Sequence, residues 1–338
     1  MRSDVEALEK AVEWLDGLGL GNQHDRLHKY LNSVRHQLPL PTGIPEAAKM
    51  GFIFLEAREF VDIYEAYQGA ETPTLIAKLK RVFKGPWTLS EESVNNSDAR
   101  NTMFELSLAA GLKLRGVDVE LGEPDLVINF PQGQYLVECK RPFKESSVKE
   151  NVEGAKRQLR ANLKPDQHGV IAVSLSRIVN SGSTMLGVTV GNQDTAGTIH
   201  GNLQADLHRR CVSLMRDQLS SLIVSPNIAV LMFDVSTPYM TENGEGLARG
   251  FRCYPTDEPK VIRGKVAASR TLANAFTYFD STLGQALEND LSPQAHTVSD
   301  LIDMKSQLPP GVGIVISKNR TDSSPMELIY PMAFKPPR

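Results

Sequence analysis

The sequence has few of the features that place a protein in a membrane, outside the cell or on a disulfide scaffold. Its longest uninterrupted apolar run, from Ile228 to Phe233, is far shorter than the roughly 20 residues needed to cross a bilayer. The first residues, Met-Arg-Ser-Asp-Val-Glu-Ala, contain no apolar signal segment. The three cysteines are widely spaced and form no Cys-x-x-Cys pair, which argues against a structural zinc site and favours a reducing compartment. We therefore expect a cytoplasmic protein that makes no use of a membrane.

Net charge is also small. The 338 residues include 37 Lys and Arg against 40 Asp and Glu, a formal charge of −3, and 41% of them are hydrophobic. These proportions are typical of a globular protein and exclude disordered and collagen-like chains. They also exclude a uniformly basic surface for nucleic acid, although a local basic surface stays open. At roughly 150 residues per domain, the length suggests two domains or one core with additions.

Charge is distributed unevenly along the chain. Between Glu91 and Glu138 there are nine acidic and three basic residues, whereas between Lys140 and Lys164 there are eight basic and three acidic ones. Such a switch from an acidic to a basic stretch calls for a physical reason. The residues at its boundary are the ones with site-like chemistry.

Hydrophobic spacing and turn residues divide the chain into three regions. Residues 1–96 are predicted to form a helical N-terminal region, because apolar residues recur there at helical spacing. Residues 97–235 are predicted to form an α/β core. A stretch at about 180–204 that is rich in Gly, Ser, Thr and Asn is predicted to be a loop insertion in this core. Residues 236–338 are predicted to be a C-terminal extension of mixed structure.

The core region has the clearest pattern. Capping residues, alternating apolar residues and Pro-containing or Gly-containing turns predict the order α-β-β-β-α-β for residues 97–175. The expected elements are a helix from about 98 to 115, strands at 117–121, 126–130 and 135–140, a basic helix at about 147–163 and a strand at 169–175. Further along the chain we expect a helix at 205–223, a strand at 228–235, Gly/Pro-punctuated loops beyond Thr237, a helix near 270–288 and short strands at 312–316 and 327–330.

Four residues of the core combine into a pattern with chemical meaning. Side chains alternate along a strand, so Glu138 and Lys140 should project from the same face, with Tyr135, Val137 and Cys139 on the other. An acid and an ammonium group at the end of an apolar strand are easier to explain if a metal or an anionic substrate is present.

Two further acids can reach the same place. Asp125 begins the neighbouring strand, where a turn containing Pro124 holds its carboxylate near the strand edge. Glu105 lies in the middle of the preceding helix. Three converging carboxylates would raise one another's pKa unless a cation compensates, and Mg²⁺ or Mn²⁺ accepts such oxygen ligands. Lys140 would then orient the hydrolytic water and stabilise charge on the phosphate.

At these residues the sequence resembles the PD-(D/E)xK nuclease superfamily, which has the restriction-endonuclease-like fold. Pro124-Asp125 corresponds to the PD element and Glu138-Cys139-Lys140 to ExK, while Glu105 matches an acid that many members carry on the helix before the sheet. The resemblance implies an α-β-β-β-α-β core with a mixed sheet, Mg²⁺ or Mn²⁺ as cofactor, and Asp125, Glu138, Glu105 and the backbone carbonyl of Cys139 as metal ligands. It covers about residues 97–175 and extends at most to 235.

The resemblance has one departure. Some exonuclease-like branches carry Gln-x-x-x-Tyr on the next helix; here Gln158 fits, but position 162 is Asn. That puts assignment to those branches in doubt and leaves the core motif intact.

The basic helix completes the prediction, because it would contact the phosphate backbone next to the metal. The residues expected to contact nucleic acid are Arg141, Lys144, Lys156, Arg157, Gln158 and Arg160. The sequence thus predicts a metal-dependent nuclease acting on nucleic acid, DNA rather than RNA, of a prokaryotic defence or repair type. Two alternatives stay open. One is a non-catalytic nucleic-acid-binding or scaffold protein with the same fold. The other is a nuclease subunit whose helical N-terminal region recruits a regulatory protein partner that switches cleavage on. For the partner itself, a second copy of the chain in a homodimer and a regulatory protein both stay open.

Overall fold

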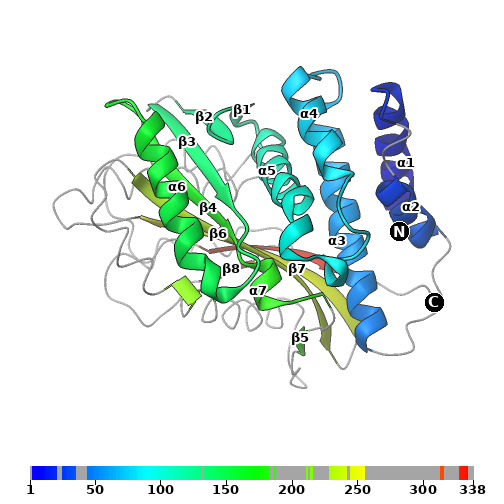
Figure 1. Cartoon of the computed structure of the whole chain (residues 1–338). Helices are drawn as coiled ribbons and strands as arrows, with labels where there is room; N and C mark the ends of the chain where they lie inside the picture. The colour runs from blue at the N-terminus through cyan, green and yellow to red at the C-terminus, as the bar shows by residue number, and fades with distance from the viewer. Residues whose placement is uncertain are drawn as a thin grey trace.

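The computed structural model is a mixed α/β arrangement in which helices cover both faces of a sheet (Figure 1). It describes residues 2–20, 25–35, 44–130, 133–182, 186–187, 211, 214–215, 228–241, 244–255, 313–315 and 327–333. Within these residues no helix is long and apolar enough to cross a membrane.

The N-terminal region is helical, as predicted. Its helices are α1 (Arg2–Gly17), α2 (Asp25–Arg35), α3 (Ile44–Tyr67) and α4 (Pro73–Val82). The start of α4 illustrates why they form where they do. The Thr72 hydroxyl accepts a hydrogen bond from the Leu75 backbone N–H at 3.2 Å, and Pro73 lies in the first turn, where its missing N–H costs nothing.

The order α-β-β-β-α-β is confirmed for the core. The elements are α5 (Asp98–Lys113), β1 (Asp118–Leu121), β2 (Leu126–Phe130), β3 (Gly133–Lys140), α6 (Val148–Asn162) and β4 (His168–Ser174). Short 3₁₀ turns precede α5 and α6, namely η2 (Leu89–Glu91), η3 (Val94–Asn96) and η4 (Glu145–Ser147). Each predicted boundary lies within two residues of the observed one.

One mixed sheet joins these strands to later ones. Its order is β1-β2-β3-β4-β6-β7-β9-β8, with β5 (Leu186–Gly187) pairing beside it on β6. The pairs β1–β2 and β2–β3 are antiparallel, whereas β3–β4 and β4–β6 are parallel. The later strands are β6 (Ile228–Thr241), β7 (Gly244–Pro255), β8 (Gly313–Val315) and β9 (Glu327–Ala333). A four-residue helix, α7 (Ser176–Val179), follows β4.

The two faces of the sheet have separate cores. Tyr135, Val137 and Cys139 of β3 belong to the core shared with α5 and the N-terminal helices. Leu136 belongs to the core on the α6 side, with Val152 among others. Figure 1 shows α6 on one side of β3 and β4 and α5 on the other. The predicted alternation along β3 is therefore confirmed, and Glu138 lies on the α6 side with Leu136.

The C-terminal part differs from the sequence prediction in one element. Residues 244–255 were expected to form Gly/Pro-punctuated loops, but they form β7, which pairs with β6 from Thr241↔Gly244 to Val230↔Pro255. A long neighbouring strand supplies backbone partners to this segment, so pairing outweighs its weak local strand preference. The strand predicted from 228 is confirmed and extends to Thr241, beyond position 235.

The other predictions here have mixed outcomes. The strands predicted at 312–316 and 327–330 are confirmed as β8 and β9. β5 lies in the stretch predicted to be a loop insertion. The helix expected at 205–223 falls outside the described residues except for residues 211 and 214–215, which are helical. The helix expected near 270–288 lies wholly outside them. The division into three regions stays a prediction.

Candidate functional site

The register of β2 and β3 brings the predicted Asp125 and Glu138 together. Leu126 pairs with Val137 in the antiparallel ladder, so Asp125 and Glu138 are the next two residues to face each other. Asp125 Oδ2 accepts a hydrogen bond from the Cys139 backbone N–H at 2.8 Å. This bond fixes the carboxylate at the edge of β3, where the sequence predicted it.

Glu138 and Lys140 project from the same face of β3, as alternation requires. Lys140 Nζ donates a hydrogen bond to Glu138 Oε2 at 2.9 Å, and the Glu138 side chain is only 3% exposed. Burial raises the pKa of Glu138; Lys140 opposes this effect and Asp125 adds to it. A further cation nearby would stabilise the ionised form of this buried carboxylate.

Glu105 approaches Asp125 from α5 and is held by a lysine. Burial and the charge of Asp125 raise the pKa of Glu105, whereas Lys78 opposes the increase. Lys78 Nζ lies 2.5 Å from Glu105 Oε2, and each side chain is 11% exposed. The pair joins α4 to α5, because Lys78 comes from α4.

Asp125 is the carboxylate that interacts with both of the others. Glu105 acts on it from the α5 side, whereas Glu138 lies on the opposite face of β3. Lys78 neutralises Glu105 and Lys140 neutralises Glu138. Among the described residues, Asp125 is thus the one of the three without a lysine partner.

The carboxylates of this region differ in whether they could hold a metal ion. Among the described residues, no group of three or more His, Cys, Asp and Glu side chains is arranged to hold one. Asp125 and Glu138 are nevertheless adjacent oxygen donors whose repulsion a divalent cation would relieve. The donor chemistry of this pair therefore fits Mg²⁺ or Mn²⁺. The Cys139 side chain belongs to the core on the α5 side of β3, and burial and the nearby carboxylates raise the pKa of its thiol.

The residues predicted to contact nucleic acid divide into two groups. Lys144 and, on α6, Arg157, Gln158 and Arg160 are exposed, so their side chains can reach a partner. Lys156 is buried and lies 3.6 Å from Glu153.

Arg141 is the clearest departure, because its guanidinium is directed into the protein. Its side chain is 6% exposed and makes a two-pronged contact with Glu92. Arg177 of α7 approaches the same carboxylate, with Nε 3.5 Å from Glu92 Oε2. A direct phosphate contact from Arg141 would require this pair to open.

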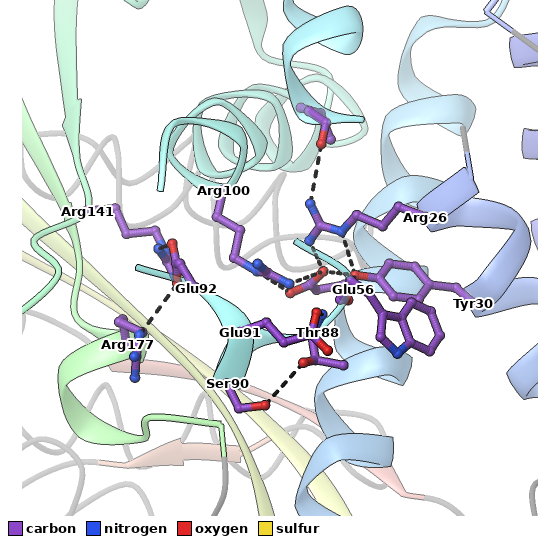
Figure 2. Close-up of polar contacts among 12 residues, drawn as sticks. Arg26, Tyr30, Glu56, Thr88, Ser90, Glu91, Glu92, Arg100, Arg141 and Arg177 are labelled. Atoms are coloured by element: carbon purple, nitrogen blue, oxygen red, sulfur yellow. Dashed lines mark hydrogen bonds and ion pairs between the residues drawn. The ribbon is translucent and has the colours of Figure 1, made fainter. Parts of the chain in front are cut away.

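A second buried carboxylate lies nearby and also has two arginines (Figure 2). Arg26 of α2 and Arg100 of α5 both donate to Glu56 of α3, and Tyr30 donates to the same group. Burial alone would raise the pKa of Glu56, but Arg100 and Arg26 together lower it to about 2. We refer to Arg26, Arg100, Arg141 and Arg177 with Glu56 and Glu92 as the arginine network.

The segment before α5 links the two halves of this network. The Tyr30 hydroxyl oxygen also lies 3.1 Å from the Trp87 carbonyl oxygen, and Glu92 follows Trp87 by five residues. Between them, the Thr88 backbone N–H donates to the Glu91 carboxylate. The network therefore connects the N-terminal helices with the ends of β3 and β4.

Sequence reasoning missed Lys78, Glu92 and Arg177. For Lys78 a signal existed, because it shares the buried face of α4 with Leu75, Leu79 and Val82; a lysine on an otherwise apolar helix face often has a buried partner. Glu92 and Arg177 are far apart in sequence from Arg141, and no local pattern marks them.

No family model, curated protein or solved structure matches the chain.

Proposed function

We propose that this chain is a metal-dependent nuclease of the PD-(D/E)xK type, with a restriction-endonuclease-like core in residues 97–175. The observation that carries the proposal is the placement of Asp125 beside Glu138 and Lys140 at the ends of two paired strands. The confirmed element order and the parallel β3–β4 pair support it.

Asp125 and Glu138 would hold the metal ion, with the Cys139 carbonyl as a further donor from the same strand end. Glu105 lies close enough to Asp125 for the two charges to repel, so it would complete or support the metal site once a cation is bound, while Lys78 holds the Glu105 carboxylate in place. When bound, Mg²⁺ or Mn²⁺ would lower the pKa of a coordinated water and offset charge on the scissile phosphate.

Lys140 has the position for a direct role. Its ammonium group is ion-paired with Glu138, and its side chain is 19% exposed against 3% for Glu138. It can therefore donate to a water or to a phosphate oxygen without leaving Glu138. A group that donates to the developing negative charge stabilises the transition state more than the ground state.

The exposed side of α6 would receive the phosphate backbone. Arg157 and Arg160 are exposed near its C-terminal end, and Lys144 is exposed before its start. Such contacts depend on charge and give affinity without reading base sequence. The substrate is proposed to be DNA rather than RNA.

The second candidate is a non-catalytic nucleic-acid-binding or scaffold protein with the same fold. The observation that favours it is the neutralisation of two of the three carboxylates by Lys78 and Lys140. In that case nucleic acid would bind to α6, while divalent ions would leave both binding and the nucleic acid unchanged.

Cleavage assays distinguish the two. The purified chain is incubated with single-stranded, duplex and branched DNA and with RNA, in Mg²⁺, Mn²⁺, Ca²⁺ or a chelator. We expect cleavage in Mg²⁺ or Mn²⁺, none in Ca²⁺ or chelator, and loss of turnover by at least about 100-fold in Asp125→Asn, Glu138→Gln and Lys140→Met. Glu120→Gln, which changes an exposed carboxylate on β1, serves as the control and should keep wild-type turnover. Cleavage that persists in excess chelator, or in any of the three site variants, contradicts the proposal.

A further inference from the structure

The arginine network holds more positive than negative charge. Its four guanidinium groups face two carboxylates, those of Glu56 and Glu92, in the part of the chain that the structure describes. Three of the four arginine side chains are exposed by 6% or less. Burial raises the pKa of Tyr30, so its phenol stays neutral and adds no negative charge. Buried charges are ordinarily matched by partners of opposite sign, and here two positive charges are in excess.

Two donors in the network make no hydrogen bond among the described residues. Arg100 Nη1 is buried without one. Arg177 Nε is ion-paired with Glu92 at 3.5 Å but forms no hydrogen bond. Unpartnered buried N–H groups are rare because each has lost its hydrogen bonds to water without replacement. Burial lowers the pKa of Arg177; Glu92 opposes this effect, and Arg141 and Arg100 add to it. These cations therefore repel one another, and an anion between them would relieve the repulsion.

The network lies at an edge of the sheet where ligands commonly bind. Arg141 directly follows β3, and Arg177 lies in α7, directly after β4. These two strands are parallel, so both arginines are at the carboxyl ends of adjacent strands. In open α/β sheets this edge is the usual place for ligands. Lys140, at the end of β3, places the edge next to the carboxylates described above.

Arg177 is the member of the network that solvent reaches most easily. Its side chain is 12% exposed, twice the value for Arg141. The guanidinium carbon lies 4.7 Å from the centre of the Phe143 ring, which holds the flat group in one orientation. A ligand would thus meet Arg177 before the more buried Arg141 and Arg100. Figure 2 shows Arg177 and Arg141 on either side of Glu92.

We infer that the arginine network receives one phosphate group, in its dianionic form, at the carboxyl ends of β3 and β4. The charge supports this choice, because a phosphate monoester carries close to two negative charges at neutral pH, equal to the excess of the network. An internal phosphodiester carries only one. Planar guanidinium groups also match the oxygen geometry of a phosphate. The ligand would be a terminal phosphate, either of a nucleic-acid end or of a mononucleotide.

The site does not depend on a metal ion, so it is tested in chelator. Thermal unfolding is followed with inorganic phosphate and with sodium chloride at the same ionic strength. Binding is then measured for a mononucleotide and for one oligonucleotide carrying either a 5′-phosphate or a 5′-hydroxyl. We expect phosphate to raise the unfolding temperature above the chloride value. We also expect the 5′-phosphate to strengthen oligonucleotide binding about tenfold relative to the 5′-hydroxyl, because it adds charged hydrogen bonds to the guanidinium groups. Saturable binding of the mononucleotide would identify the nucleotide as a sufficient ligand. Binding of the 5′-phosphorylated oligonucleotide alone would identify the nucleic-acid end as the ligand.

Variants separate a ligand site from a structural ion network. Arg177→Gln should abolish the preference for the 5′-phosphate, and Arg177→Lys, which keeps the charge but loses the planar fork, should retain part of it. Arg58→Gln, which changes a half-buried arginine on α3 outside the network, is the matched control and should bind like the wild type. Equal binding of the two oligonucleotides by the wild type, or a preference unchanged in Arg177→Lys and Arg177→Gln, overturns the inference. Because no metal is present, these results stand apart from success or failure of the nuclease proposal.

Discussion

Two charged regions meet at the end of β3, and they differ in how their charge is balanced. The acidic region contains Asp125, Glu138 and Glu105, with one lysine each for the last two. The arginine network has two arginines for each of its two carboxylates. Lys140 and Arg141 are neighbours in sequence, yet Lys140 contacts the acidic region and Arg141 contacts the network.

The difference indicates what each region would accept. An acidic excess next to a strand edge suits a divalent cation, and a cationic excess suits an anion. A phosphate ester that contacts both regions would have a divalent cation on one side and guanidinium groups on the other. That is the arrangement expected for phosphodiester hydrolysis.

Removing a carboxylate from the network should have the largest effect on stability. Glu56→Gln leaves Arg26 and Arg100 buried without a counter-charge, and we expect the free energy of unfolding to fall by about 3–5 kcal/mol. Urea denaturation at neutral pH measures this change. Glu91→Gln is the control, because Glu91 is exposed and should cost less than about 1 kcal/mol. A loss of similar size in both variants would show that the network contributes no more than the surface does.

The pH dependence of Glu56 has a definite sign. Its pKa in the folded chain is about 2, below the ordinary glutamate value of 4.5. The stabilisation is therefore present above the unfolded pKa and is lost as pH falls toward the folded one. Between pH 5 and pH 2 the wild type should lose more stability than Glu56→Gln. Parallel curves would contradict the low pKa.

Loss of Lys78 from the acidic region should lower the free energy of unfolding by a smaller amount. Lys78→Met leaves Glu105 unpaired, but burial already raises the pKa of Glu105, so the carboxyl group can take up a proton. We expect a loss of about 2 kcal/mol at neutral pH, below the usual value for a broken buried pair. Adding Glu105→Gln should restore much of it, which a double-mutant cycle measures. Additive losses would show that the two side chains do not act as a pair.

Replacing Glu138 should change the free energy of unfolding by a smaller amount and in the opposite direction. Its pKa is raised in the folded chain, so its contribution to stability is present below the unfolded pKa and is lost as pH rises through the folded value. At neutral pH without metal, Glu138→Gln should therefore unfold with a free energy about 0.5–1 kcal/mol higher than the wild type. Mn²⁺ should reverse the order by stabilising only the wild type. A variant less stable than the wild type in chelator would contradict the raised pKa.

The smallest effect is expected when charges on the exposed face of α6 are changed, and it concerns the salt dependence of nucleic-acid affinity. Charge reversal at Arg157 and Arg160 should reduce the slope of log affinity against log salt by roughly 0.7–0.9 for each lost phosphate contact. Lys149→Glu, an exposed change in the first turn of the same helix, is the matched control and should alter the slope less. An unchanged slope in the double variant would mean that this end of α6 faces away from nucleic acid.

Local pattern was sufficient to predict the core elements but not their long-range partners. Residues 126–130 and 135–140 alternate or run apolar between clear turns, so β2 and β3 were predicted within two residues, and the side-by-side placement of Asp125 and Glu138 follows from that hairpin. Arg141 was predicted to contact phosphate because it follows a strand in a basic stretch. Its partner Glu92 lies 49 residues earlier, and only tertiary packing brings the two together. β7 was missed for the same reason, since its strand structure depends on pairing with β6.

Calorimetric titration with Mn²⁺ measures directly whether the acidic region binds a metal ion. It is carried out on the wild type, Asp125→Asn and the control Glu120→Gln at neutral pH, without nucleic acid. We expect saturable binding to the wild type and to Glu120→Gln, and at least a tenfold loss of affinity in Asp125→Asn, because Asp125 interacts with both Glu105 and Glu138. The absence of saturable binding to the wild type, or equal affinity in all three proteins, would contradict the assignment of this region as a metal site.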